Sequence, residues 1–212
     1  MKIKYNAPVI LTYTFLCVAV TALHLYLVYN LTVDWFMVPG KDEFSFKSVQ
    51  NWITLVTHVA GHLHWNHLVG NFSIILLIGP MLEENYGSFA LFFMILITAA
   101  VTGILNALFF SSALMGASGV VFMMILLASF TNFTKGEIPL TFILVMVLYL
   151  GGQLMNSLNS QTQNISHFAH IAGGFCGSLF GFFISPKRGR SPGHGPAPAA
   201  GHGPGPGHGP GH

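Results

Sequence analysis

Apolar stretches without any acidic or basic residue alternate with shorter polar segments along the chain. An α-helix rises 1.5 Å per residue, so about 20 apolar residues cross a hydrocarbon core of about 30 Å. Stretches near this length recur along the sequence, and we predict that each forms a membrane-spanning helix. The six expected spans are residues 8–29, 65–82, 88–110, 118–133, 138–155 and 167–185.

The segments outside these spans differ in character. Residues 30–56 mix charged and aromatic side chains, as is typical of a membrane interface, and we expect this long loop to be structured. Residues 191–212 are almost entirely Gly, Pro, Ala and His, which predicts a disordered tail behind a membrane domain of residues 1–190. A cleaved signal peptide is the alternative to the first span, but the apolar run continues to Tyr29 and favours a retained helix.

Composition supports an all-α membrane protein. The chain is 52% hydrophobic and only 7% charged, too few charges for a water-soluble surface. A formal net charge of +2 gives no basic surface for nucleic acid. Cys17 and Cys176 both lie in apolar runs, so neither a disulfide framework nor a thiolate nucleophile is indicated.

The basic residues predict the orientation of the spans. An even number of spans puts both termini on one side, and the excess of Lys and Arg marks the cytoplasmic side. Six basic residues share the side of the termini, namely Lys2, Lys4, Lys135, Lys187, Arg188 and Arg190, against Lys41 and Lys47 opposite. With cytoplasmic termini, the second, fourth and sixth spans begin at the outer face, so their first turns lie at one membrane level.

Ser118 opens the fourth span and is the candidate nucleophile. It lies between Gly116 and Gly119, which let a second backbone approach, and the free N–H groups of a helix N-terminus favour developing negative charge. From Gly119 to Thr134 the helix extends about 24 Å, short of the bilayer core, so we expect Ser118 below the outer surface in a cavity open to water. Ordinary packing by small residues is the alternative reading of this motif.

His170 in the sixth span is the candidate base. It precedes a stripe of glycines, Gly173, Gly177 and Gly181, that allows close approach of another helix, and the fourth span is the expected neighbour. Such packing brings an imidazole within reach of the Ser118 hydroxyl, and Phe122 is placed to stack on it. A buried histidine bonded to a backbone carbonyl is the alternative.

His67 and Asn71 share one face of the second span and both can donate hydrogen bonds. Together with the Ser118 N–H they form a candidate oxyanion hole. An ordinary interhelical hydrogen bond is the alternative role for this pair. No carboxylate lies in any span to orient His170, so the sequence predicts a dyad rather than a triad.

The histidines also raise the question of a metal. His58 and His62 have the spacing of a zinc pair, but no glutamate stands between them and no carboxylate completes the set, so no metal and no cofactor are predicted. We expect His62 to tie the start of the second span to the loop before it. His24 is expected to be structural, and the roles of His58 and His64 stay open.

These residues resemble those of the rhomboid family of intramembrane serine proteases. The resemblance covers most of residues 56–184 and rests on four groups of residues in order along the chain. They are His62 with His67 to Asn71, Gly79 to Glu83 with Gly87, Gly116 to Gly119, and Ala169 to Gly173 with Gly177. The chain departs from the family at Trp52, which no arginine follows, and at Phe122, where the family often has tyrosine.

The resemblance implies a compact bundle of six transmembrane helices with an interfacial loop between the first two. It also implies a serine endopeptidase with Ser118 as nucleophile, His170 as base and acid, and substrates that are transmembrane helices cut near the outer face. A catalytically silent protein that binds membrane helices on the same scaffold is the main alternative. A transporter is disfavoured because no span contains an acidic or basic residue.

Overall fold

A computed structural model describes residues 4–130, 140, 143–144, 147 and 164–186. Most of the predicted fifth span and the whole predicted tail lie outside these residues. The described part is helical, and its only pairing of β type is an isolated bridge between Val38 and Leu114. The helices are α1 Pro8–Tyr26, α2 Leu31–Trp35, α3 Val49–Thr57, the short 3₁₀ helix η1 His58–Ala60, α4 Trp65–Tyr86, α5 Ser88–Phe109, α6 Ser118–Phe130 and α8 Asn164–Phe183.

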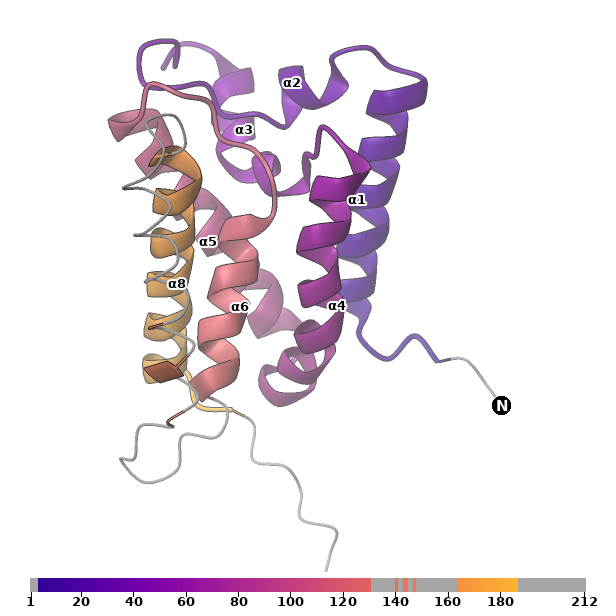
Figure 1. The fold of residues 1–212 in the computed structure, drawn as a ribbon, viewed down its shortest axis with the longest axis vertical. Coiled ribbons are helices and arrows are strands. Elements are labelled where there is room, and N and C mark those ends of the chain that lie inside the picture. Colours follow the sequence, from indigo (N-terminus) through magenta and orange to yellow (C-terminus); the bar gives the residue numbers. More distant parts are fainter. Residues whose placement is uncertain (1–3, 131–139, 141–142, 145–146, 148–163, 187–212) are drawn as a thin grey trace, which may run out of the picture.

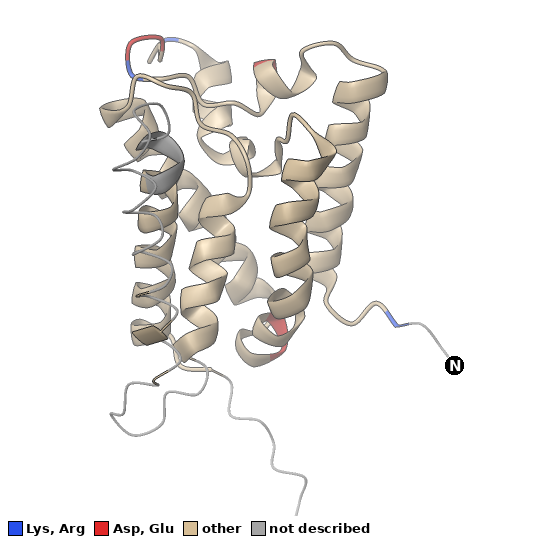
Figure 2. Ribbon diagram, viewed as in Figure 1, with Lys and Arg blue, Asp and Glu red and all other residues tan. Residues whose placement is uncertain are grey.

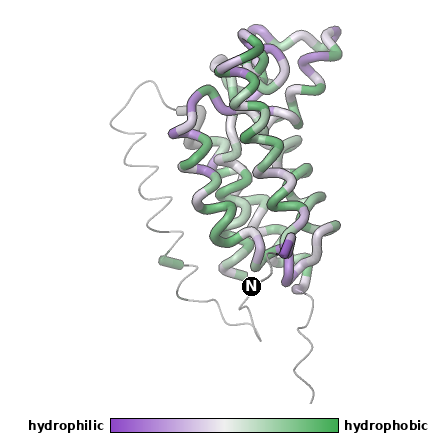
Figure 3. The backbone as a smooth tube through the Cα atoms, turned by 90° about the vertical axis from the view of Figure 1, so that its right-hand side faces the viewer, coloured by the Kyte–Doolittle hydropathy of each residue, from purple (hydrophilic) through white to green (hydrophobic). Residues whose placement is uncertain are grey.

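Three of these helices, α1, α4 and α5, are long and apolar enough to cross a membrane. Helix α6 and the apolar part of α8, Phe168–Phe183, are shorter. Green hydrophobic backbone runs along the bundle in Figure 3, whereas the described charged residues gather near its two ends in Figure 2. Apolar flanks between charged ends indicate an integral membrane protein.

Helix α8 spans Asn164–Phe183 rather than the predicted residues 167–185, and α5 ends at Phe109 rather than Phe110. Two further predicted boundaries are wrong for identifiable reasons. Helix α1 ends at Tyr26 rather than Tyr29, since the chain turns there and Asn30 adopts a left-handed conformation with φ 62°. Helix α4 continues past Leu82 to Tyr86. The charge of Glu83 suggested an end to the span, but its carboxylate is buried and accepts hydrogen bonds from the N–H groups of Val9 (2.9 Å) and Ile10 (3.1 Å).

Helix α6 occupies the centre of the described bundle, between α4 and α8 (Figure 1). Its side chains from Val120 to Met124 are all buried. It begins lower than the upper ends of α1 and α5 (Figure 1), as expected if Ser118 lies below the membrane surface. Helices α4, α5 and α8 all pack against it, which accounts for the burial of these side chains.

The loop between α1 and α4 is structured, as its aromatic and charged residues suggest. Backbone bonds join Val38 to Leu114 (2.9 and 3.0 Å) and Lys41 to Phe110 (2.7 Å), so the loop is fixed to the segment that leads into α6. From the other side, the Tyr13 hydroxyl of α1 donates to the Val59 carbonyl oxygen at 2.7 Å. The loop therefore holds the start of α6 against the rest of the bundle.

Candidate active site

The turn before Ser118 is shaped by two backbone contacts. Gly116 has φ +111°, a conformation that L side chains rarely adopt, and its N–H donates to the His58 carbonyl oxygen at 2.9 Å. The next N–H, of Ala117, points at His62 Nε2 at 3.5 Å. Ser118 is half-buried and is the first residue of α6. Because it begins the helix, its own N–H belongs to the first turn, where helix N–H groups have no intrahelical partner.

Helices α6 and α8 touch through their backbones. A Cβ added at Gly173 would lie 2.0 Å from the Gly119 carbonyl oxygen, and one at Gly177 would lie 2.2 Å from the Met123 carbonyl oxygen. At Gly119 a Cβ would meet the Ala169 carbonyl oxygen at 3.3 Å. The glycines of the predicted stripe therefore face α6, as the sequence suggested, and they fix the register of the two helices.

This register places His170 over Phe122. The two rings stack with centroids 4.5 Å apart and planes 9° apart. Phe122 follows Ser118 by four residues and so lies on the same face of α6, one turn below it. The structure thus brings the His170 imidazole to the face of α6 that begins with Ser118.

His67 and Asn71 of α4 both approach the start of α6. The His67 imidazole lies against Gly116, where an added Cβ would be 2.6 Å from Cε1 and 2.8 Å from Nε2. The Asn71 amide nitrogen lies 3.1 Å from His62 Nε2, which leaves its second N–H for another acceptor. Both predicted oxyanion residues therefore border the same turn as Ser118.

His62 joins these parts. Its buried Nε2 faces both the Ala117 N–H and the Asn71 amide, so Nε2 is the acceptor and the ring proton is on Nδ1. The ring also contacts His67 edge to face, with centroids 4.9 Å apart. Burial, and secondarily the charge of His67, lowers the pKa of His62 from 6.5 to about 4, so the imidazole is neutral and can accept at neutral pH.

Sequence reasoning left the role of His58 open, and the structure assigns it a structural one. The side chain is buried, its Nδ1 donates to the Leu55 carbonyl oxygen at 3.2 Å, and its Nε2 lies 3.3 Å from the Thr102 hydroxyl. Burial lowers the pKa of His58 to about 4. Within the described residues, no three His, Cys, Asp or Glu side chains gather as a metal site would require.

Thr102 belongs to a polar stripe on α5 that sequence reasoning missed. Thr98, Thr102 and Asn106 are all buried and four residues apart, so they share one helix face. The Thr102 methyl group would lie 3.2 Å from a Cβ at Gly119, and the Asn106 amide donates to the Ser112 carbonyl oxygen at 3.1 Å. The four-residue spacing of these polar residues in an otherwise apolar span is the signal in the sequence that could have identified this face.

Several helices are apolar and long enough to cross a membrane, and histidines and an asparagine surround the first turn of a buried helix. These two features define a helical membrane protein with an internal polar site. The Rhomboid domain model matches residues 49–187, and the chain belongs to the rhomboid family. This match includes the helices that pack against α6, namely α4, α5, α8 and the short helix η1.

Curated relatives agree with this assignment. Rhomboid-like protein 11, chloroplastic, of Arabidopsis thaliana is 22% identical over 73% of this chain and 61% of its own length. The Rhomboid protease GlpG of Haemophilus influenzae is 25% identical over 64% of this chain and 71% of its own. Rhomboid-related protein 1 of Caenorhabditis elegans is 32% identical over 58% of this chain and 37% of its own. The chain thus spans less than two thirds of the Arabidopsis and Caenorhabditis proteins.

Proposed function

We propose that this chain is an intramembrane serine endopeptidase that hydrolyses peptide bonds in or near transmembrane segments of other membrane proteins. The observation that carries the proposal is the register of α6 and α8, which stacks His170 on Phe122 one turn below Ser118. The family assignment and the similarity to a relative named as a protease support the same activity.

The first chemical step is attack on the substrate carbonyl carbon. Ser118 Oγ forms the new bond while its proton passes to the His170 imidazole, which acts as general base. Negative charge develops on the carbonyl oxygen, and the N–H groups of Ser118, His67 and Asn71 donate to it. The contacts of His62 with Asn71 and Ala117 hold two sides of this oxyanion site before substrate arrives.

Collapse of the tetrahedral intermediate breaks the peptide bond. His170 returns its proton to the leaving amine nitrogen and leaves an acyl ester on Ser118. Water then attacks this ester, with His170 again as base, and Ser118 recovers its proton as the new carboxyl terminus departs. None of these steps uses a metal or another cofactor.

The same proposal includes a topology. Six spans with cytoplasmic termini follow from the apolar stretches and the basic residues, and they open the site toward the extracytoplasmic side. A membrane domain of residues 1–190 followed by the tail of residues 191–212 belongs to this arrangement. Transmembrane proteins and the lipid bilayer are then the partners.

The experiment compares wild type, Ser118→Ala and His170→Ala in liposomes with a transmembrane peptide that carries a fluorophore and a quencher. We expect each substitution to reduce cleavage at least ~1000-fold while the protein stays folded. A fluorophosphonate probe should label wild type and not Ser118→Ala. Equal labelling of the two proteins, or an intact peptide beside folded wild type, would support the non-cleaving helix binder instead.

A further inference from the structure

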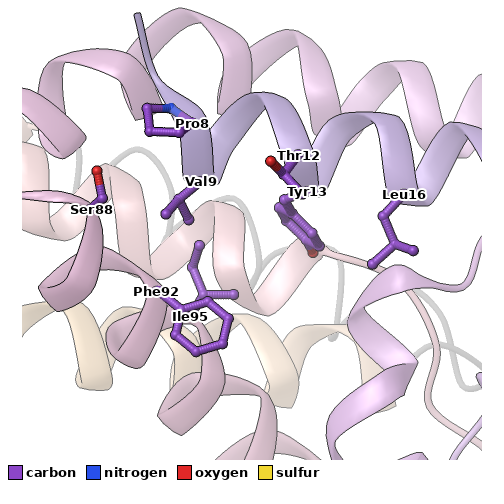
Figure 4. Close-up of a pocket in the computed structure, with 8 residues that line it drawn as sticks. All are labelled: Pro8, Val9, Thr12, Tyr13, Leu16, Ser88, Phe92 and Ile95. Atoms are coloured by element: carbon purple, nitrogen blue, oxygen red, sulfur yellow. The ribbon is translucent and has the colours of Figure 1, made fainter. Parts of the chain in front are cut away.

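Helix α5 changes character along its length. Where it faces α1, Phe92 and Ile95 line an apolar cavity of about 350 Å³ (Figure 4). From the next turn onward it carries the buried polar side chains of Thr98, Thr102 and Asn106. A polar side chain buried among apolar helices is costly unless it has a partner, so its partners indicate what it does. The partners of Thr102 lie around the start of α6.

The Thr102 hydroxyl contacts the ring of His58. This ring is neutral at neutral pH, because burial lowers the pKa of His58 to about 4. Its Nδ1 donates to the Leu55 carbonyl oxygen, so Nε2 is an acceptor, and the Thr102 hydroxyl lies 3.3 Å from Nε2. The hydroxyl also lies 2.8 Å from the Thr98 carbonyl oxygen of its own helix, so the two acceptors share its proton. The contact with Nε2 links α5 to the segment that precedes α4.

His58 passes this link on to the turn before Ser118. Its carbonyl oxygen accepts from the Gly116 N–H at 2.9 Å, and Gly116 has φ +111°. The backbone near His58 is held by α5 as well, since a Cβ at Gly103 would lie 2.3 Å from the Leu55 carbonyl oxygen. Helix α5 therefore fixes both the ring and the backbone of His58, and through them the first residue of the turn.

The Thr102 methyl group borders the other end of the same turn. A Cβ at Gly119 would lie 3.2 Å from this methyl group and 3.8 Å from the Thr102 hydroxyl oxygen. Helices α5 and α6 pack against each other here. Ser118 stands between Gly116 and Gly119 in the chain, so one buried side chain contacts both sides of the turn, once through His58 and once directly.

We propose that Thr102 is a positioning residue for Ser118, the nucleophile of the proposed proteolysis on which this inference rests. Its hydroxyl acts through His58 on Gly116, and its methyl group acts on Gly119. Together they hold the turn in the orientation that aims the Ser118 N–H and Oγ at a substrate carbonyl group. A displacement of about 1 Å near a reacting group can cost about 100-fold in rate, so loss of the hydroxyl should slow the chemical step.

Thr102→Val removes the hydroxyl and keeps the shape of the side chain. On the quenched transmembrane peptide, kcat per folded molecule should fall at least about tenfold while KM stays within about twofold of wild type, because Thr102 is buried and acts only through its neighbours. Thr102→Ser, which restores a hydroxyl, should recover at least about a third of the wild-type kcat.

Thr98→Val is the matched control, since it is the same change one turn away, where the hydroxyl donates to the Met94 carbonyl oxygen of its own helix. It should keep wild-type kinetics. Equal kinetics of Thr102→Val and Thr98→Val, or a loss in Thr102→Val that Thr102→Ser does not reverse, would overturn the proposal.

Hydrogen–deuterium exchange at the Gly116 amide tests the same contacts without substrate. In wild type this amide should exchange at least about 100-fold more slowly than an unprotected amide, and in Thr102→Val at least about tenfold faster than in wild type. Fast exchange in wild type would refute the proposal even if the variant failed to fold. An inactive wild type would overturn the proposed function, whereas unchanged exchange in Thr102→Val beside an active wild type would overturn only the role of Thr102.

Discussion

At the scale of single residues, one neutral imidazole connects the parts of the candidate oxyanion site. His62 faces the Ala117 N–H, the Asn71 amide and the edge of the His67 ring. If His62 were protonated, its Nε2 could no longer accept from the Ala117 N–H and the Asn71 amide. Burial lowers the pKa of His62, so the ring stays neutral at neutral pH. For the proposed reaction we therefore propose that His62 is a positioning residue, since it would act only through Asn71 and the turn before Ser118.

Replacement of this acceptor should lower activity more than stability. We expect His62→Leu to reduce cleavage roughly 10- to 100-fold, because Asn71 and Ala117 lose the group that orients them. His62→Gln, which restores an acceptor oxygen, should recover part of the loss, and His64→Leu in the same loop should behave as wild type. The assay is cleavage per folded molecule. A loss of activity that only follows the loss of folded protein, without rescue by Gln, would contradict the positioning role.

At the scale of elements, the contact of α6 with α8 depends on backbone atoms that cannot move aside. Gly173→Ala would place a Cβ 2.0 Å from the Gly119 carbonyl oxygen, so α8 must shift and carry His170 away from Phe122. We expect at least a tenfold loss of cleavage and a lower melting temperature. The loss should appear in purified protein under conditions where wild type is fully folded.

The neighbouring glycine provides a matched control for this change. A Cβ at Gly174 would meet only side-chain carbons of Leu126, at 3.7 Å, which is ordinary contact. Gly174→Ala should therefore stay within about twofold of wild type in cleavage, with a small gain in helix stability. If the two alanine variants behaved alike, the close approach of the helices at Gly173 would not be what places His170.

A second element depends on a residue far away in the sequence. The buried Glu83 carboxylate caps the N-terminus of α1 by accepting from Val9 and Ile10. Hydrogen bonds to charged groups contribute about 1.5–3 kcal/mol, so Glu83→Ala should lower the free energy of unfolding by roughly 2 kcal/mol or more. Titration with SDS from mild detergent micelles measures this. Glu43→Ala, which removes an exposed carboxylate of the first loop, is the control, and an equal effect of both changes would argue against the cap.

At the scale of the whole molecule, two buried histidines make folding depend on pH. His58 and His62 have pKa values near 4 in the folded protein, against 6.5 for an unperturbed histidine. Between these values the unfolded chain binds more protons, so the free energy of unfolding falls as pH falls from 6.5 to 4. Each histidine contributes on the order of 3 kcal/mol across this window.

The melting temperature in detergent should therefore decline from pH 6.5 to pH 4, with little change from the two histidines above pH 6.5. His62→Gln should flatten part of this decline, because glutamine cannot bind the proton that the unfolded histidine takes up. His64→Gln, a change at an exposed histidine, should keep the wild-type slope. A wild-type melting temperature that stays constant over this range would show that neither buried imidazole governs the acid limit.

The sequence by itself determined which stretches form apolar helices and which side chains are candidates for the chemistry. Helices of bilayer length begin at Pro8, Trp65 and Ser88 as predicted, since the absence of charge over about 20 residues is visible without a partner. The Gly173 and Gly177 stripe was also visible, because small residues four apart leave a flat helix face.

Only the tertiary structure decided which faces meet. The 3.6-residue period gives each helix a face but no partner, so the contact of His62 with Ala117 and the role of Thr102 appear only when loops and helices pack. Glu83 misled the prediction of a helix end for the same reason. In the sequence alone, a charged residue indicates a position at the surface, where a membrane span ends. Only in the folded protein do the free N–H groups at the start of α1 reach the Glu83 carboxylate and make it a buried acceptor.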